Sequence, residues 1–411
     1  MGYLPRLVDP LLRDLLGEFP ALLVLGPRGV GKTTTAAEYA RTVLRLDRPG
    51  EAAALAADPD SVLRGLPEPV LIDEWQLVPS VLAAVKRAVD TERRPGRFLI
   101  TGSVHADLED QTWPGTGRLV RVDMAGLTTR ELVGVVDQTP FLERVATSGA
   151  AGLRLPETPV DLRAYVQVAL QGGFPESALH LTPRGRRRWA RSYLGQLFTR
   201  DLTQVDVPRD PHLLHRYFEA YALNTAGQPT DQSLFQAAGV DRKTATAYDH
   251  LLANLFVTTS VPSWHSNRLH RLVRTPKRYV LDTGLLSAAG GFAEEDFLRD
   301  GDLLGRFLDT FVFNQLRAEL PLLDCEPRLY HLRDQGGRHE VDLIVELDAR
   351  RVVAIEIKAS ADPGPGAAKH LAWLRDQLGE QFVHGLVLHT GPRIFPMGDR
   401  ITAAPISTIW S

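Results

Sequence analysis

The chain contains 411 residues, which is enough for about two to four domains of ordinary size. Its hydrophobic content of 44% and charged content of 24% are typical of a globular protein, and its net charge of −3 excludes a global basic field for nucleic acid. The one cysteine, Cys325, excludes an intramolecular disulfide and a cysteine-rich zinc site. No apolar run approaches the length of a membrane span and no cationic leader is present, so we expect a cytoplasmic protein without a membrane partner.

A phosphate-binding loop is predicted near the N-terminus. Ala21–Leu25 is an apolar run that predicts a buried strand, and the next residues, GPRGVGKT, fit the pattern G-x-x-x-x-G-K-[ST]. In that pattern backbone N–H groups and a helix N-terminus bind phosphate. We therefore predict ATP and Mg²⁺ as cofactors, with Lys32 on the β- and γ-phosphates and Thr33 on the metal. The predicted nucleotide-binding residues are Gly26, Pro27, Arg28, Gly29, Val30, Gly31, Lys32, Thr33 and Thr34.

Two further strands are predicted to carry polar groups to this loop. The run VLIDE ends in two acids, the Walker B pattern, in which Asp73 enters the Mg²⁺ shell and Glu74 polarises the attacking water. The run FLITGS has a polar tip where Thr101 or Ser103 would sense the γ-phosphate, and the alternative is an ordinary strand-end turn. Strands that alternate with helices indicate a parallel sheet with its ligand at the carboxyl ends of the strands.

An arginine that stabilises charge on the transferred phosphoryl group is also expected. Arg118 and Arg200 are both candidates, either within the chain or as a finger offered to a neighbouring copy in a homo-oligomer. Their positions in the sequence do not choose between them.

Short motifs along the chain form a recognisable set. They are DEWQ at 73–76, TGS at 101–103, GRL at 117–119, LTTREL at 127–132, GGFP at 172–175, YL at 193–194, RDL at 200–202, TPKRY at 275–279 and DTGL at 282–285. Together with the phosphate loop, this set resembles a group of prokaryotic AAA-family ATPases whose C-terminal half is a domain of unknown function. The resemblance covers nearly the whole chain and implies an ATPase. The roles of the motifs outside the ATPase core do not follow from the residues.

The middle of the chain predicts helices. Residues 141–205 are expected to form a helical, lid-like segment, and residues 206–285 a winged helix-turn-helix. Asp241 is expected to cap the third helix of this region. The predicted helices span 213–223, 231–238 and 242–255, and the strands of the wing begin at 256–257 and near 279.

DNA is the predicted partner of the winged helix. In such folds one helix lies in the major groove, and here it would present Arg242, Lys243, Thr244 and Thr246. A basic run follows that would contact phosphates, formed by Arg268, Arg271, Arg274, Lys277 and Arg278. The alternative is a protein-docking or lid module, because winged helices also serve AAA ATPases in that way. The arginines at 184–188 are expected to form a solvated face.

The C-terminal region predicts a polar cluster on paired strands. Its predicted elements are an amphipathic helix at 303–320 and strands at 340–347 and 352–359. A turn centred on Ala349 places Asp342 opposite Glu356, and a turn centred one residue later places Asp342 opposite Lys358. Directly opposed residues point to the same face, so either register gathers the three side chains.

Two carboxylates and a lysine on one face resemble the D…E-x-K constellation of PD-(D/E)xK nucleases. There the carboxylates hold Mg²⁺ and the lysine activates water or stabilises the phosphorane. We therefore expect Asp342 and Glu356 to bind metal, with Lys358 as a catalytic partner. Asp309, where the family usually carries glutamate, would be the third metal ligand. The alternative is a nuclease-like fold retained as a binding or structural module.

The sequence thus predicts an α/β protein that binds and hydrolyses ATP, coupled to the binding and cleavage of DNA. The leading alternative is a nucleotide-dependent regulatory switch with an inactive nuclease-like domain and a protein partner. A small-molecule kinase is disfavoured, because Glu74 supplies a water-activating acid and no second phosphate-acceptor site is evident. The expected domains are an AAA-type P-loop ATPase at 1–140, a helical segment at 141–205, a winged helix at 206–285 and a PD-(D/E)xK-like α/β domain at 300–411.

Overall fold

The computed structural model describes residues 2–103, 117–201, 210–265, 275–334, 337–348 and 351–411. These divide into two compact units, the first formed by residues 1–126 with 254–256 and the second by residues 127–253 with 257–411. Residues 127–140, which we expected in the ATPase domain, therefore pack within the second unit. Arg268, Arg271 and Arg274 lie outside the described residues, as does the side chain of Arg200.

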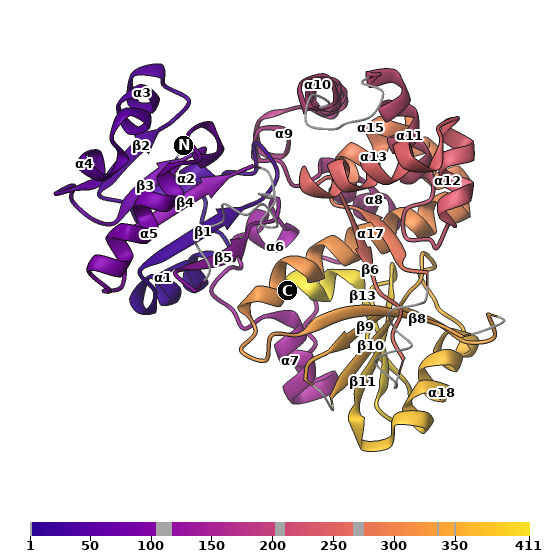
Figure 1. The fold of residues 1–411 in the computed structure, drawn as a ribbon. Coiled ribbons are helices and arrows are strands. Elements are labelled where there is room, and N and C mark those ends of the chain that lie inside the picture. The colour runs from indigo at the N-terminus through magenta and orange to yellow at the C-terminus, as the bar shows by residue number, and fades with distance from the viewer. Residues whose placement is uncertain (1, 104–116, 202–209, 266–274, 335–336, 349–350) are drawn as a thin grey trace. The chain divides into compact units, whose positions relative to one another are not determined.

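The first unit is built on a parallel sheet of five strands (Figure 1). Its order is β2-β3-β4-β1-β5, and every neighbouring pair runs parallel. The expectation of a parallel sheet from alternating strands and helices is confirmed, and β1 has the predicted bounds. The strands are β1 (Ala21–Leu25), β2 (Thr42–Arg45), β3 (Val70–Asp73), β4 (Phe98–Gly102) and β5 (Leu119–Asp123).

Helices cover this sheet because its strands are apolar on both faces; β1, β3 and β4 are buried throughout. One face packs Leu22, Val24 and Leu99 against Leu12 of α1 and Ala36 of α2. The helices are α1 (Asp9–Glu18), α2 (Lys32–Ala37), α3 (Pro49–Ala57), α4 (Pro59–Leu63) and α5 (Val81–Thr91).

The second unit begins with a helical region. Side-chain N-caps start three of its helices: Asp210 accepts the N–H of His212, Thr230 that of Ser233, and Asp241, the predicted cap, that of Thr244 at 2.9 Å. The helices are α6 (Thr129–Leu132), α7 (Phe141–Ser148), α8 (Leu162–Gln171), α9 (Pro175–His180), α10 (Pro183–Asp201), α11 (Pro211–Leu223), α12 (Asp231–Ala238), α13 (Arg242–Asn254), α15 (Thr283–Gly290) and α16 (Glu294–Arg299). Strands β6 (Thr258–Val261) and β7 (Lys277–Val280) pair antiparallel, close to where the wing was predicted.

A mixed sheet of six strands follows, in the order β12-β13-β11-β10-β9-β8. Helix α18 (Lys369–Leu378) covers one of its faces, where Leu371 and Leu374 pack against Ile344, Val352 and Ala354. Helix α17 (Gly301–Glu319) contacts β10 and α7 (Figure 1). The strands are β8 (Arg328–Arg333), β9 (Glu340–Glu346), β10 (Val352–Ile357), β11 (Phe382–His389), β12 (Phe395–Gly398) and β13 (Ile401–Pro405).

The register of β9 and β10 corresponds to the turn centred on residue 349. Val352 pairs with Glu346 and Ile355 with Leu343, so Asp342 is the residue that continues the ladder opposite Glu356. The alternation of apolar and polar residues along 340–347 predicts one buried and one polar face, but α18 covers most of the second face, where Ile344 is fully buried. Only the end of the two strands keeps polar side chains on this face.

Two of the signature motifs meet at the partly buried carboxylate of Asp282. Asp282 accepts the N–H of Gly173 at 2.7 Å and caps α15 by accepting the N–H of Leu285 at 2.8 Å. Gly172 has φ of 66°, and a Cβ there would lie 2.9 Å from the Asp282 carboxylate. The GGFP and DTGL motifs therefore form a single structural joint, which explains a pattern that the sequence alone did not.

Candidate functional site

The phosphate loop connects β1 to α2 and its backbone requires glycine. Gly31 has φ of 98°, a left-handed conformation that other residues rarely adopt. A Cβ at Gly26 would lie 2.3 Å from the carbonyl oxygen of Met124. Arg6, which sequence reasoning missed, supports the loop: it is 5% exposed and donates to the carbonyl of Val30 at 2.9 Å. No sequence motif marks an arginine so far upstream.

Lys32 lies inside this loop. Its Nζ donates to the carbonyl oxygens of Gly26 at 2.9 Å and Pro27 at 2.8 Å. Burial lowers the pKa of Lys32 to about 8, although the nearby carboxylates of Glu74 and Asp73 act in the opposite direction. The ammonium is thus held by the same backbone that would surround a phosphate. Thr34, by contrast, is exposed in the first turn of α2.

Asp73 joins the phosphate loop to two neighbouring strands. Its Oδ1 accepts the hydroxyl of Thr33 at 2.7 Å and the hydroxyl of Thr101 at 2.5 Å. A hydroxyl beside a carboxylate is a donor set of hard oxygens, which is what Mg²⁺ prefers. Thr33 and Asp73 therefore fit the metal that accompanies ATP. Mg²⁺ held by these residues would neutralise charge on the phosphates.

Glu74 follows directly at the end of β3 and has φ of 60°. Its Oε2 accepts the hydroxyl of Ser103 at 3.0 Å and also the side-chain amide of Gln76. Gln76 was not a predicted site residue, although the DEWQ motif contains it. Gly102 ends β4 between Thr101 and Ser103, and a Cβ there would lie 2.5 Å from Trp75 Nε1. The DEWQ and TGS motifs therefore pack on each other and orient Glu74.

The structure separates Arg118 from this group. Arg118 precedes Leu119, which pairs with Ala21 at the amino end of the parallel strands, whereas the phosphate loop follows Leu25 at the carboxyl end. At about 3.3 Å per residue, the length of β1 places the two roughly 20 Å apart. Arg118 instead pairs with Asp90 at 2.9 Å. The expectation that Arg118 completes the site within its own chain is therefore wrong.

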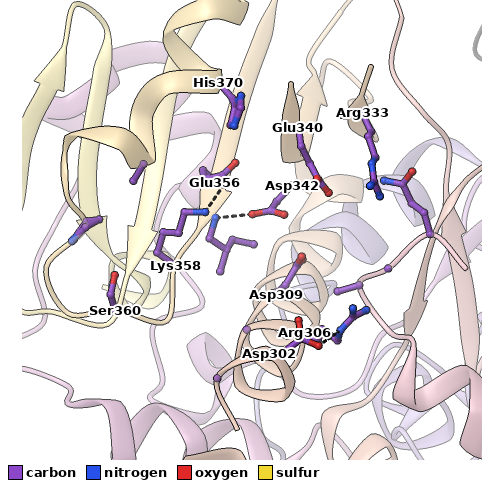
Figure 2. A pocket seen from close by; sticks show the side chains of 18 of the residues that line it. Asp302, Arg306, Asp309, Arg333, Glu340, Asp342, Glu356, Lys358, Ser360 and His370 are labelled. Atoms are coloured by element: carbon purple, nitrogen blue, oxygen red, sulfur yellow. Dashed lines mark hydrogen bonds and ion pairs between the residues drawn. The ribbon is translucent and has the colours of Figure 1, made fainter. Parts of the chain in front are cut away.

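A second polar cluster lies in the second unit, at the end of β9 and β10. Figure 2 shows Asp342, Glu356 and Lys358 close together, with Asp309 approaching from α17. They line a cavity of about 940 Å³. Glu356 Oε1 accepts from Lys358 Nζ at 2.6 Å, and Asp342 Oδ2 accepts from the N–H of Ile357 at 2.9 Å.

Lys277 was assigned to a basic run for DNA phosphates, and the structure corrects that assignment. It is 3% exposed, and its Nζ lies 2.6 Å from Asp309 Oδ2 and 3.1 Å from Asp342 Oδ1. Arg278, from the same run, is also buried and pairs with Asp231 and Asp249. Neither side chain is available to a phosphate backbone.

The expected second metal site does not fit this geometry. The described part of the chain contains no group of three histidine, cysteine or acidic side chains placed to hold a metal ion. An ammonium lies between Asp309 and Asp342, where a shared cation would be needed. Burial, together with the charge of Asp342, raises the pKa of Glu356 to about 8, which disfavours the charged ligand that a metal requires. We derive no reaction step through a metal here.

The helix predicted to enter the major groove keeps only part of its proposed surface. Arg242, Lys243 and Thr246 of α13 are exposed. Thr244 is buried and its hydroxyl donates to Asp241 at 2.9 Å, so it stabilises the helix start and does not face a partner.

Comparison with known proteins agrees with the first unit. Residues 18–133 match the family described as an AAA domain, residues 162–296 match a domain of unknown function (DUF8612), and residues 304–409 match a domain of unknown function (DUF4143). The chain is 29% identical over 403 residues to the uncharacterized proteins Mb2031c of Mycobacterium bovis and Rv2008c of Mycobacterium tuberculosis, covering 97% of this chain and 82% of each of those.

Two solved structures are also similar to this chain. The Walker-type ATPase PABY2304 of Pyrococcus abyssi has 15% identity and a TM-score of 0.41, over 68% of this chain and 94% of that one. A RuvB variant of Thermotoga maritima has 18% identity and a TM-score of 0.29, over 62% of this chain and 89% of that one.

The fold, the loop and the family match of the first unit together define a class: the chain carries an AAA-type P-loop ATPase domain. Joined to it is a C-terminal domain of unknown function. Within the described ranges, no helix is both long and apolar enough to cross a membrane.

Proposed function

We propose that the chain hydrolyses ATP at the carboxyl end of its parallel sheet. The observation that carries this proposal is the convergence of the Thr33 and Thr101 hydroxyls on Asp73, beside Lys32. Lys32 and the loop bind the phosphates, and Thr33 with Asp73 holds Mg²⁺. Glu74, oriented by Ser103, accepts a proton from the attacking water.

The test is ATP turnover by the purified chain. Wild type should release phosphate in Mg²⁺ and stop when the metal is chelated. Lys32→Ala should bind nucleotide far more weakly, because it removes the positive charge that contacts the phosphates. Lys86→Ala is the matched control, since it makes the same substitution in α5, where Lys86 pairs with Asp90 at 3.2 Å outside the phosphate loop. Equal turnover by Lys32→Ala and wild type would refute the proposal.

We further propose that ATP hydrolysis drives a regulatory switch and that the second unit binds a partner without cleaving it. The occupation of the acidic cluster by Lys277 favours this alternative over a metal-dependent nuclease. The exposed Arg242 and Lys243 support DNA as that partner, and a protein partner is the competing reading of the same helix. Stimulation of ATP turnover by duplex DNA would favour DNA; absence of stimulation and of binding at low salt would favour a protein.

A further inference from the structure

A lysine from β7 is inserted into the acidic cluster beside β9 and β10. Lys277 is almost fully buried, and its Nζ contacts one oxygen of Asp309 at 2.6 Å and one of Asp342 at 3.1 Å. Nζ also lies 3.3 Å from the carbonyl oxygen of Asp342. Three oxygen atoms from two elements thus surround a single positive charge, an arrangement that resembles the oxygen shell of a bound cation.

The other oxygen atoms of these two carboxylates are held by neutral donors. Tyr279, two residues after Lys277, donates its hydroxyl to Asp309 Oδ1 at 2.9 Å. The N–H of Ile357 donates to Asp342 Oδ2 at 2.9 Å. Both carboxylates are therefore fixed in place and both point one oxygen at the lysine.

The third carboxylate is not fully satisfied. Glu356 is 6% exposed; Lys358 binds its Oε1, but Oε2 is buried and has no donor among the described residues. Leaving a buried acceptor without a partner costs about 1–3 kcal/mol. Figure 2 shows the Glu356 carboxylate next to Asp342, on the wall of the cavity of about 940 Å³. Neither Lys277 nor Lys358 binds this oxygen, so it is available to a ligand in the cavity.

The balance of charge depends on Lys277. Three carboxylates face two lysines, and without Lys277 only the half-exposed Lys358 would remain. Three carboxyl groups with one lysine offer an oxygen donor set for Mg²⁺ or Mn²⁺. A lysine that is part of the chain competes with such a cation at a high effective concentration, because it cannot diffuse away.

We propose that Lys277 is a tethered counter-ion that stands in for a divalent cation and excludes it from Asp309, Asp342 and Glu356. Removal of the ammonium creates a divalent metal site in which the unpaired oxygen of Glu356 becomes a ligand. This inference rests on the geometry of the cluster and does not depend on ATP hydrolysis, so the two can fail separately.

The experiment measures Mn²⁺ binding to the full chain without nucleotide, by the electron paramagnetic resonance signal of free Mn²⁺. Lys277→Met should bind one more Mn²⁺ per chain than wild type, and Asp342→Asn added to Lys277→Met should abolish that extra site. Lys358→Met is the matched control. It also removes one lysine charge from the cluster but leaves Lys277 in place, so it should bind no additional Mn²⁺.

Several results would overturn the proposal. They are a Lys277→Met chain that gains no Mn²⁺, a wild-type chain with an Mn²⁺ site that Asp342→Asn removes, or an equal gain in Lys358→Met. Thermal unfolding covers the case of a destabilised variant, because Mn²⁺ that binds only the folded state must raise its midpoint. Lys277→Gln, which keeps a hydrogen-bond donor, is the second variant. If both variants stay unfolded in saturating Mn²⁺, a divalent cation cannot replace the ammonium and the proposal is wrong.

Discussion

Glu74 has a backbone conformation that its side chain does not favour. With φ of 60° it lies in the left-handed region, which costs an L-residue about 1–2 kcal/mol. The conformation turns the carboxylate toward Ser103, which follows β4, and toward Gln76, which lies two residues further along the chain. Strain of this kind persists only where the surroundings impose it, and it is common at functional sites.

Glu74→Gln should therefore keep the geometry of the site but lose most of the ATP turnover. The amide retains an acceptor for Ser103 but cannot take a proton, so we expect turnover to fall about 10²–10⁴-fold while nucleotide affinity is retained. Single-turnover phosphate release and nucleotide titration measure the two separately. Ser103→Ala, which removes only the orienting hydroxyl, should have a smaller effect. Wild-type turnover in Glu74→Gln would exclude Glu74 as the base.

Nucleotide affinity should depend on pH through Lys32. Its pKa is about 8 in the free chain, and bound phosphate favours the charged ammonium and so raises that pKa. Below pH 8 the charge is already present. Above pH 8 each binding event must take up a proton, so the nucleotide affinity should decrease with pH, with a limiting slope of about tenfold per pH unit.

A nucleotide titration in a metal chelator between pH 7 and 9.5 measures this dependence without interference from magnesium. Lys32→Arg retains its charge over the whole range and should give a flat profile at whatever affinity it keeps. A flat profile in wild type as well would show that the Lys32 ammonium does not titrate in this window.

At the scale of elements, α17 connects distant parts of the second unit. Gln315 accepts the N–H of Thr129 at 2.8 Å, and Glu319 pairs with Arg130 at 2.6 Å, both from the LTTREL motif. The side chains of Arg130 and Glu319 are 3% and 1% exposed. The motif therefore docks α6 on α17, which is why residues 127–140 belong to the second unit.

Arg130→Met should destabilise the chain by about 3–5 kcal/mol, because Glu319 would remain buried without its counter-charge. Adding Glu319→Gln removes that charge and should recover most of the loss. Urea unfolding of wild type, the two single variants and the double variant measures the coupling. Additive losses would show that the pair does not act as a unit.

The sequence predicted the elements whose signals are local and missed those that depend on distant partners. β1, the phosphate loop and α12 follow from apolar runs, glycine positions and caps within a few residues, and each has the predicted bounds or nearly so. Lys277 contacts Asp309 and Asp342, which lie 32 and 65 positions away in the sequence. A local sequence pattern therefore could not show that its charge is neutralised by buried acids. Arg118 was misplaced because a motif does not reveal which end of a parallel strand it occupies.

For the whole molecule, DNA binding is the prediction that most needs a solution measurement. If Arg242 and Lys243 contact phosphates, duplex affinity should fall with salt at a log–log slope of about −0.9 for each phosphate neutralised. Reversing both charges with Arg242→Glu and Lys243→Glu should flatten the slope by about 2. Arg184→Glu and Arg188→Glu, on exposed positions of α10, are the control. No association at low salt would favour a protein partner.

The internal ion pairs of the second unit also limit where recombination can divide this chain without harming its fold. Lys277 and Arg130 lie before residue 300, and the acids that they neutralise, Asp309, Asp342 and Glu319, lie after it. A genetic exchange between residues 285 and 300 would deliver buried acids without their bases. Lys277 lies in the matched region 162–296 and Arg130 in the matched region 18–133, so both regions are expected to be inherited together with region 304–409.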